Sequence, residues 1–181
     1  DGAVRLVAPV TEIVAGAEAA VDHYKLQRDG RDGYHFGLLH VALGRAARVS
    51  TQTFSLGAAI ARHDVEGVLD GEGAEATLNG LYLAGGRAHV DNHTMVEHAR
   101  PHGTSRELYK GVLSGQARAV FNGSVNVRPD AQKTSAVQTN KNLVLSEEAV
   151  VHTKPELEIR ANDVQCKHGA TIGQISADAL F

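Results

Sequence analysis

A short pattern of small and apolar positions recurs along this chain. A small residue is followed, three positions later, by a second small or apolar residue, and two positions after that by a third. The copies are Gly16-AE-Ala19-A-Val21, Gly44-RA-Ala47-R-Val49, Gly71-EG-Ala74-E-Ala76, Gly85-GR-Ala88-H-Val90, Ser114-GQ-Ala117-R-Ala119, Ser146-EE-Ala149-V-Val151 and Ala161-ND-Val164-Q-Cys166. Their starts are separated by 28, 27, 14, 29, 32 and 15 residues, which is one or two multiples of about 14 to 16.

In each copy the small first residue is typical of a turn. The alternation that follows is typical of a short strand whose alternate side chains face the same way. Apolar and polar residues alternate most cleanly over residues 117–127 and 156–166, where we expect strands. Strands that recur at a fixed period bury their inward faces by stacking on their neighbours. The sequence therefore predicts an all-β protein, a flattened parallel β-solenoid with roughly 28 residues per turn.

Two local features bear on this fold. Residues 11–26 also fit a helix, because small and apolar residues recur there every three or four positions. Prolines are few, and the pattern places Pro101, Pro129 and Pro155 at bends or strand starts. A proline there costs no hydrogen bond of a strand interior.

Composition and charge narrow the classes of function. A chain of 181 residues fits one domain. Lys and Arg total 18 against 21 Asp and Glu, so no general electrostatic attraction to nucleic acid or to an anionic membrane is expected. No apolar run approaches the roughly 18 residues of a membrane span, and no secretory signal is visible. We expect no nucleic-acid partner, no membrane partner and a cytoplasmic location.

The segment 163-DVQCKHGATIGQI-175 contains the only cysteine, Cys166, with His168 two positions later. On a strand both side chains would face the same way, with Cα atoms roughly 6 to 7 Å apart. A thiolate with an imidazole suits iron, zinc or copper. Such sites need about four protein ligands, so this pair is at most half of a site completed by another chain. The alternative is a buried structural thiol beside a surface histidine.

A second candidate is residues 89–102, which carry four of the ten histidines, His89, His93, His98 and His102. On a helix, histidines four positions apart could share a metal ion, although no HExxH motif is present. On a strand, His89, Asp91 and His93 would share a face instead. We favour strand and loop, with the histidines in turn and stacking hydrogen bonds.

Signals for catalysis are weak. The sequence has no Walker or GxGxxG phosphate loop and no GxSxG motif. Two sets of polar residues are expected in other roles, a solvated strand face for Glu147, Glu148, Glu156 and Glu158, and backbone hydrogen bonds at bends for Asn122, Asn126, Asn140 and Asn142. Hexapeptide acyltransferases have turns of about 18 residues, which the longer period disfavours. A carbohydrate-active β-helix enzyme is our alternative, but its carboxylates would have to converge on one external groove, whereas the aspartates here are scattered.

Five segments, in their order along residues 89–181, carry a resemblance to a known family. They are "ELYKGVL", "ARAVFNG", "DAQKTSAVQTNKNLVLS", "TKPELEI" and "CKHGATIG". Together they are similar to the SufB/SufD family of iron-sulfur cluster assembly proteins. The last segment resembles the SufD branch more than the SufB branch, whose corresponding stretch is acidic.

The resemblance implies a right-handed parallel β-helix, with residues 1–181 as the core domain of a longer protein whose terminal helical regions are absent. It implies a scaffold that is not an enzyme. Such a scaffold pairs with SufB through a strand edge, and with the ATPase SufC through a carboxy-terminal region missing from this chain.

In the family, the histidine matching His168 is implicated as a cluster ligand at the SufB–SufD interface, and the cysteine matching Cys166 lies in the same interface. The resemblance therefore implies a transient iron-sulfur cluster shared with SufB at these two residues. We expect no stable cofactor in the isolated chain, and homodimerisation through the same edge when SufB is absent.

Overall fold

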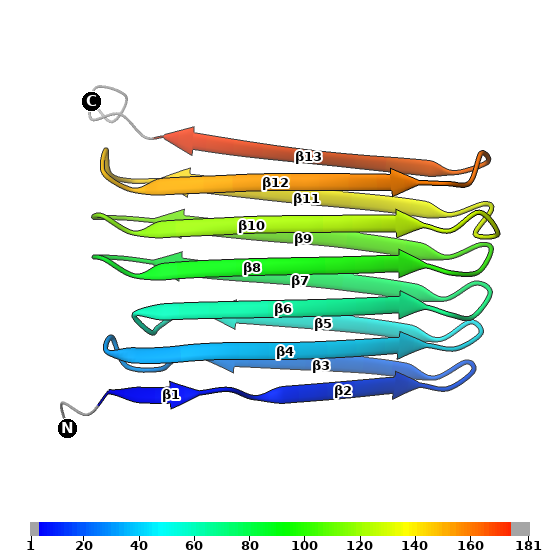
Figure 1. Cartoon of the computed structure of the whole chain (residues 1–181), viewed down its shortest axis with the longest axis horizontal. Coiled ribbons are helices and arrows are strands. Elements are labelled where there is room, and N and C mark those ends of the chain that lie inside the picture. The colour runs from blue at the N-terminus through cyan, green and yellow to red at the C-terminus, as the bar shows by residue number, and fades with distance from the viewer. Residues whose placement is uncertain (1–3, 175–181) are drawn as a thin grey trace.

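The computed structural model describes residues 4–174 as two sheets that lie one behind the other (Figure 1). The predicted domain, residues 1–181, and the resemblance both include residues 175–181, which lie outside the described residues. Sheet A contains β1 (Arg5–Val7), β2 (Val10–Ala15), β4 (Gly33–Leu43), β6 (Ile60–Leu69), β8 (His89–His98), β10 (Arg118–Val127) and β12 (Val150–Ile159). Sheet B contains β3 (Ala20–Gln27), β5 (Arg48–Ser55), β7 (Glu75–Ala84), β9 (Thr104–Leu113), β11 (Ser135–Val144) and β13 (Gln165–Gln174).

The chain passes alternately from one sheet to the other, and all strand pairs are parallel. Ile60, His89 and Arg118 occupy the same position in three successive turns. About 6 turns of roughly 29 residues result, which confirms the predicted parallel solenoid and its period. Between residues 4 and 174 there is no helix that could span a membrane.

The recurring sequence pattern corresponds to the bend between the two sheets. In one bend the Ala47 N–H donates to the Gly44 carbonyl oxygen over 3.1 Å, and Ala47 is fully buried. The same bond from the fourth residue to the first closes the bends at 16–19, 71–74, 85–88, 114–117 and 146–149. The small first residue and the buried or half-buried fourth residue therefore define where each strand begins.

Three local predictions are wrong. Residues 11–26 form parts of β2 and β3 rather than a helix, because β2 pairs with β4 and β3 pairs with β5. Residues 156–166 are not one strand, since β12 ends at Ile159 and β13 begins at Gln165. Pro155 lies inside β12, not at a bend.

Pro155 is tolerated because β12 is the last strand of sheet A. The N–H groups of Val150 and Arg160 donate to carbonyl oxygens of residues 117 and 127 on the β10 side. In a parallel ladder every second residue bonds to the same neighbour, so the backbone nitrogen of Pro155 faces the free edge. No ladder hydrogen bond is lost there.

Large side chains in the interior lie over glycines of the neighbouring turn. Gly80 pairs with Tyr109, and Tyr82 pairs with Gly111. Both tyrosines are buried. A Cβ atom on Gly80 would lie 2.2 Å from Tyr109 Cε1, and one on Gly111 would lie 2.1 Å from Tyr82 Cε2. The glycines therefore make the space that the rings fill.

Polar side chains also occupy the interior. Asn140 and Asn142 lie within β11 and are buried. Asn142 Nδ2 donates to Asn140 Oδ1 over 2.6 Å, Asn140 Nδ2 donates to the Tyr82 hydroxyl over 3.2 Å, and that hydroxyl donates to Asn142 Oδ1. The predicted role of these asparagines at bends is wrong, and Asn122 and Asn126 also lie within a strand, β10.

Glu107, on β9, is the carboxylate most enclosed by this interior. Its side chain is 4% exposed, and Gln138 Nε2 donates to Glu107 Oε2 over 2.8 Å. Burial raises the pKa of Glu107 from 4.5 to about 7, because the charged form loses its hydration. Hydrogen bonding from Thr94 and, to a smaller extent, from Gln138 offsets part of this effect.

Gly111→Ala should lower the free energy of unfolding by about 1–3 kcal/mol, because the added methyl overlaps the Tyr82 ring. Urea unfolding measures the change. Gly67→Ala is the matched control, since Gly67 also faces the interior but its Cβ would meet only the Met95 carbonyl oxygen, at 4.0 Å. We expect the control to unfold like the wild type or slightly later. Equal stability of the two variants would contradict the packing argument.

Glu107→Gln should stabilise the fold more at about pH 8 than at about pH 5, by about 1–3 kcal/mol. The folded-state pKa of Glu107, about 7, lies above its usual value of 4.5. Burying the charged Glu107 carboxylate therefore lowers the free energy of unfolding fully at pH values above 7. This destabilisation disappears as the pH falls from 7 towards 4.5, where the carboxyl group is protonated in both states. Urea unfolding of the variant and the wild type at both pH values measures the change in the free energy of unfolding. The contributions of the other titrating groups are the same in both proteins, so they cancel in this change. Glu66→Gln, on the outer face of β6, should show no such difference; a pH-independent effect of Glu107→Gln would disprove the assignment.

Candidate functional site

Cys166 and His168 lie on β13, the last described strand of sheet B. Their partners on β11 are Ala136 and Gln138, two buried residues whose side chains face the interior. Because register partners in a parallel sheet point to the same side, Cys166 and His168 also face the interior of the solenoid. The prediction that the two share a face is confirmed, and they lie at the end of the solenoid that no strand of residues 4–174 covers, the open end.

Cys166 is the more enclosed of the two. Its side chain is half-buried and packs against the hydrophobic core. Burial raises the pKa of the Cys166 thiol, so less thiolate is present at neutral pH. The environment stabilises a protonated thiol until a metal or another charged group approaches.

His168 is exposed at the open end, next to Cys166 on the same face. A neutral imidazole in this position offers one ring nitrogen with a lone pair and one N–H group. Within residues 4–174, no three His, Cys, Asp or Glu side chains are close enough to hold a metal ion. The described part of the chain thus brings two ligand-type residues together but not a complete ligand set.

The backbone of β13 also has a free edge at this site. The Gln165 N–H donates to the Thr134 carbonyl oxygen over 2.9 Å, so residue 165 and every second residue after it face β11. The N–H and carbonyl groups of Cys166 and His168 face the other way. No strand of the described residues pairs with that edge.

The histidines of residues 89–102 lie on strand β8 and the bend after it, as favoured by the sequence. Asp91 and His93 face outwards, where Asp91 lies 2.8 Å from Arg62 Nη1 and 2.9 Å from His93 Nε2. His98 faces inwards, and its Nε2 atom lies 2.8 Å from Ser105 Oγ. Burial lowers the pKa of His98 to about 4. The helical metal site is excluded here because residues 89–98 form a strand.

A polar cluster at the other end of the solenoid was missed by sequence reasoning. Lys25 Nζ lies 2.9 Å from His63 Nδ1, and His35 Nδ1 lies 2.8 Å from Asp29 Oδ2. The rings of His35 and His63 are 5.0 Å apart. Burial lowers the pKa of His63 to about 3 and also lowers the pKa of Lys25. The alternation of His23, Lys25 and Gln27 could have placed these side chains inside, but the helical interpretation of residues 11–26 concealed it.

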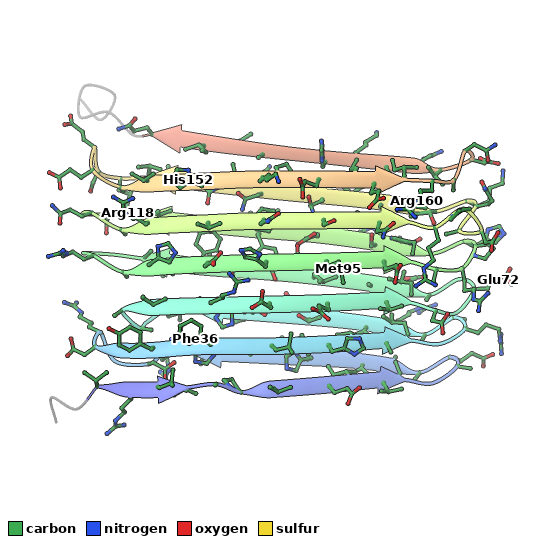
Figure 2. The ribbon with its side chains drawn as sticks, in the orientation of Figure 1. Phe36, Glu72, Met95, Arg118, His152 and Arg160 are labelled. Carbon is green, nitrogen blue, oxygen red and sulfur yellow. The ribbon has the colours of Figure 1, made fainter. Side chains whose placement is uncertain are left out.

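The outer face of sheet A has a shallow hollow of about 250 Å³, lined by Asp64, Glu66, His93, Met95 and Glu156 among others. Met95, on β8, marks its position in Figure 2. Asp64 lies 2.7 Å from Arg62, and Glu156 lies 2.7 Å from Lys154. Two of the three carboxylates are therefore paired with cations. This hollow does not present the pair of free carboxylates that glycoside hydrolysis uses.

Comparison with known proteins adds a family to this geometry. Residues 1–181 match the family described as "SUF system FeS cluster assembly, SufBD core domain". The chain is 40% identical over 172 residues to an iron-sulfur cluster assembly SufBD family protein of Synechocystis sp., covering 95% of this chain and 38% of that protein. It is 38% identical over 169 residues to the iron-sulfur cluster assembly protein SufD of Escherichia coli, covering 93% of this chain and 40% of that protein. The chain thus spans less than half the length of these relatives.

Proposed function

The chain belongs to the SufBD core domain family of the SUF system for iron-sulfur cluster assembly, and on that premise we propose that it is a scaffold subunit that pairs with SufB. In this proposal the chain catalyses no reaction itself. ATP hydrolysis belongs to SufC, which contacts the longer protein outside this chain. The assembly works in the cytoplasm, where a reducing environment keeps the Cys166 thiol free.

The observation that carries the proposal is the half-site at the open end of the solenoid. Cys166 and His168 face the interior side by side, and both are ligands that iron accepts. Iron-sulfur clusters are usually held by about four protein ligands. A partner that closes the end would supply the missing ligands, and the cluster is then a transient cargo shared between two subunits.

The free edge of β13 supports pairing by strand addition. Unpaired N–H and carbonyl groups on an exposed edge can add a strand of another chain. At the same end of the solenoid, the open edge of β12 carries Pro155 with its nitrogen towards the free side, which removes one N–H donor from the pairing with any added strand. β13 has no proline. We therefore assign the contact with SufB to β13, and a second copy of this chain takes the same edge when SufB is absent.

His168→Ala should lower the yield of reconstituted cluster at least about 10-fold, because a ligand is removed from a site that has few. The protein is mixed with SufB and SufC, iron and sulfide are added anaerobically, and the cluster is quantified by its absorbance. Cys166→Ser run in parallel separates a cluster ligand from a packing thiol: loss of yield identifies a ligand, and lowered thermal stability with normal yield identifies packing.

The control for this experiment is His152→Ala. His152 is also an exposed histidine, but it lies on the outer face of β12 (Figure 2). Its replacement should leave the yield unchanged. If His168→Ala behaves like His152→Ala, His168 is not a ligand and the proposed site is wrong.

Ile172→Pro should weaken binding of SufB about 10-fold or more without unfolding the chain. Residue 172 lies an even number of positions from Cys166, so its N–H faces the free edge and its loss breaks no bond to β11. Ile172→Ala controls for the lost side chain. Titration of labelled SufB measures the affinity, and equal affinities of the two variants would exclude strand addition at β13.

A further inference from the structure

A buried oxygen atom without a hydrogen-bond partner, Gln138 Oε1, lies in the column of side chains beneath His168. Glu107, Gln138 and His168 are register partners on β9, β11 and β13, so they stack one above another inside the solenoid. Gln138 Nε2 donates to Glu107 Oε2 over 2.8 Å. Gln138 Oε1 is buried and accepts no hydrogen bond within the described residues. A buried acceptor without a hydrogen bond destabilises a fold, because it has lost its hydration. Such an atom is therefore a candidate for a hydrogen bond that forms only in the functional state.

The orientation of the Gln138 amide is determined by its surroundings. The side chain crosses the interior to Gly123 on β10, where a Cβ atom would lie only 2.4 Å from Gln138 Nε2. Gln138 Nε2 donates to Glu107 Oε2 over 2.8 Å. This contact occupies the nitrogen end of the amide and leaves Oε1 as the free acceptor, next in the column to His168.

A histidine that binds a metal usually donates its second ring N–H to an acceptor, which fixes the tautomer and the ring orientation. The His168 side chain is exposed at the open end, one strand away from the unpaired Gln138 Oε1. We propose that Gln138, oriented by Glu107, is a positioning residue for His168: Gln138 Oε1 accepts the ring N–H and leaves the other ring nitrogen free for the cluster. This inference rests on the proposed function of His168 as a ligand.

The proposal gives a reason for burying a carboxylate that destabilises the fold. A Met at each of positions 107 and 138 would fill a similar volume without polar atoms. Replacing both members of a buried polar pair by apolar groups of similar shape is often neutral or stabilising. If the pair has only a structural role, its removal should do no harm to the site.

The experiment uses the double variant Glu107→Met/Gln138→Met in the complex with SufB and SufC. We expect thermal stability equal to or above that of the wild type, but a cluster yield about 10-fold lower. We also expect the proton of the neutral His168 ring to change its distribution between the two nitrogens, as read from ¹⁵N spectra of the complex before iron is added. Glu107→Gln keeps an acceptor for Gln138 Nε2 and should retain the wild-type yield and tautomer.

The outcomes separate this inference from the proposed function. If His168→Ala abolishes the cluster while the double variant keeps a normal yield and tautomer, His168 is a ligand and Gln138 does not position it. If His168→Ala has no effect, the proposed function itself fails. Should the double variant not fold, Gln138→Asn replaces it, because the amide is kept but is shortened by one methylene group. A wild-type tautomer and yield in Gln138→Asn would overturn the inference in the same way.

Discussion

The narrow space between the two sheets is the constraint on which the rest of this structure depends. Facing sheets lie about 10 Å apart, so inward side chains from both must share one layer. Several rings and long polar side chains fit where a glycine removes a neighbour, as with Tyr109 over Gly80 and Gln138 beside Gly123.

The same narrowness makes the polar side chains inside the solenoid depend on one another. Water has little room to solvate them, so each must find a partner within the stack. Asn140 and Asn142 do so with the Tyr82 hydroxyl, and Lys25 does so with His63. Within the described residues, buried polar atoms without a partner occur in several turns, for example at His63 Nε2 and Asn92 Nδ2. Gln138 Oε1 is the one that lies one strand from His168 in register.

Parallel stacking also determines where such a protein can meet a partner. Within residues 4–174 every inner strand is paired on both sides, and at the end of the solenoid formed by β12 and β13 each of these two strands has one free edge. The two edges differ, because Pro155 removes a donor from β12 whereas β13 keeps all of its N–H groups. Cys166 and His168 lie on β13.

The sequence by itself determined the period, the parallel solenoid and the shared face of Cys166 and His168, because bends and alternation are local properties of the chain. Local pattern failed where two structures fit the same residues: residues 11–26 have helical spacing, and only pairing of β2 with β4 and of β3 with β5 makes them strands. Tertiary structure alone decided which residues from distant turns meet. Glu107 and His168 are 61 positions apart in the chain but occupy one column, because the register of each turn on the next depends on the length of every bend between them, which no local pattern records.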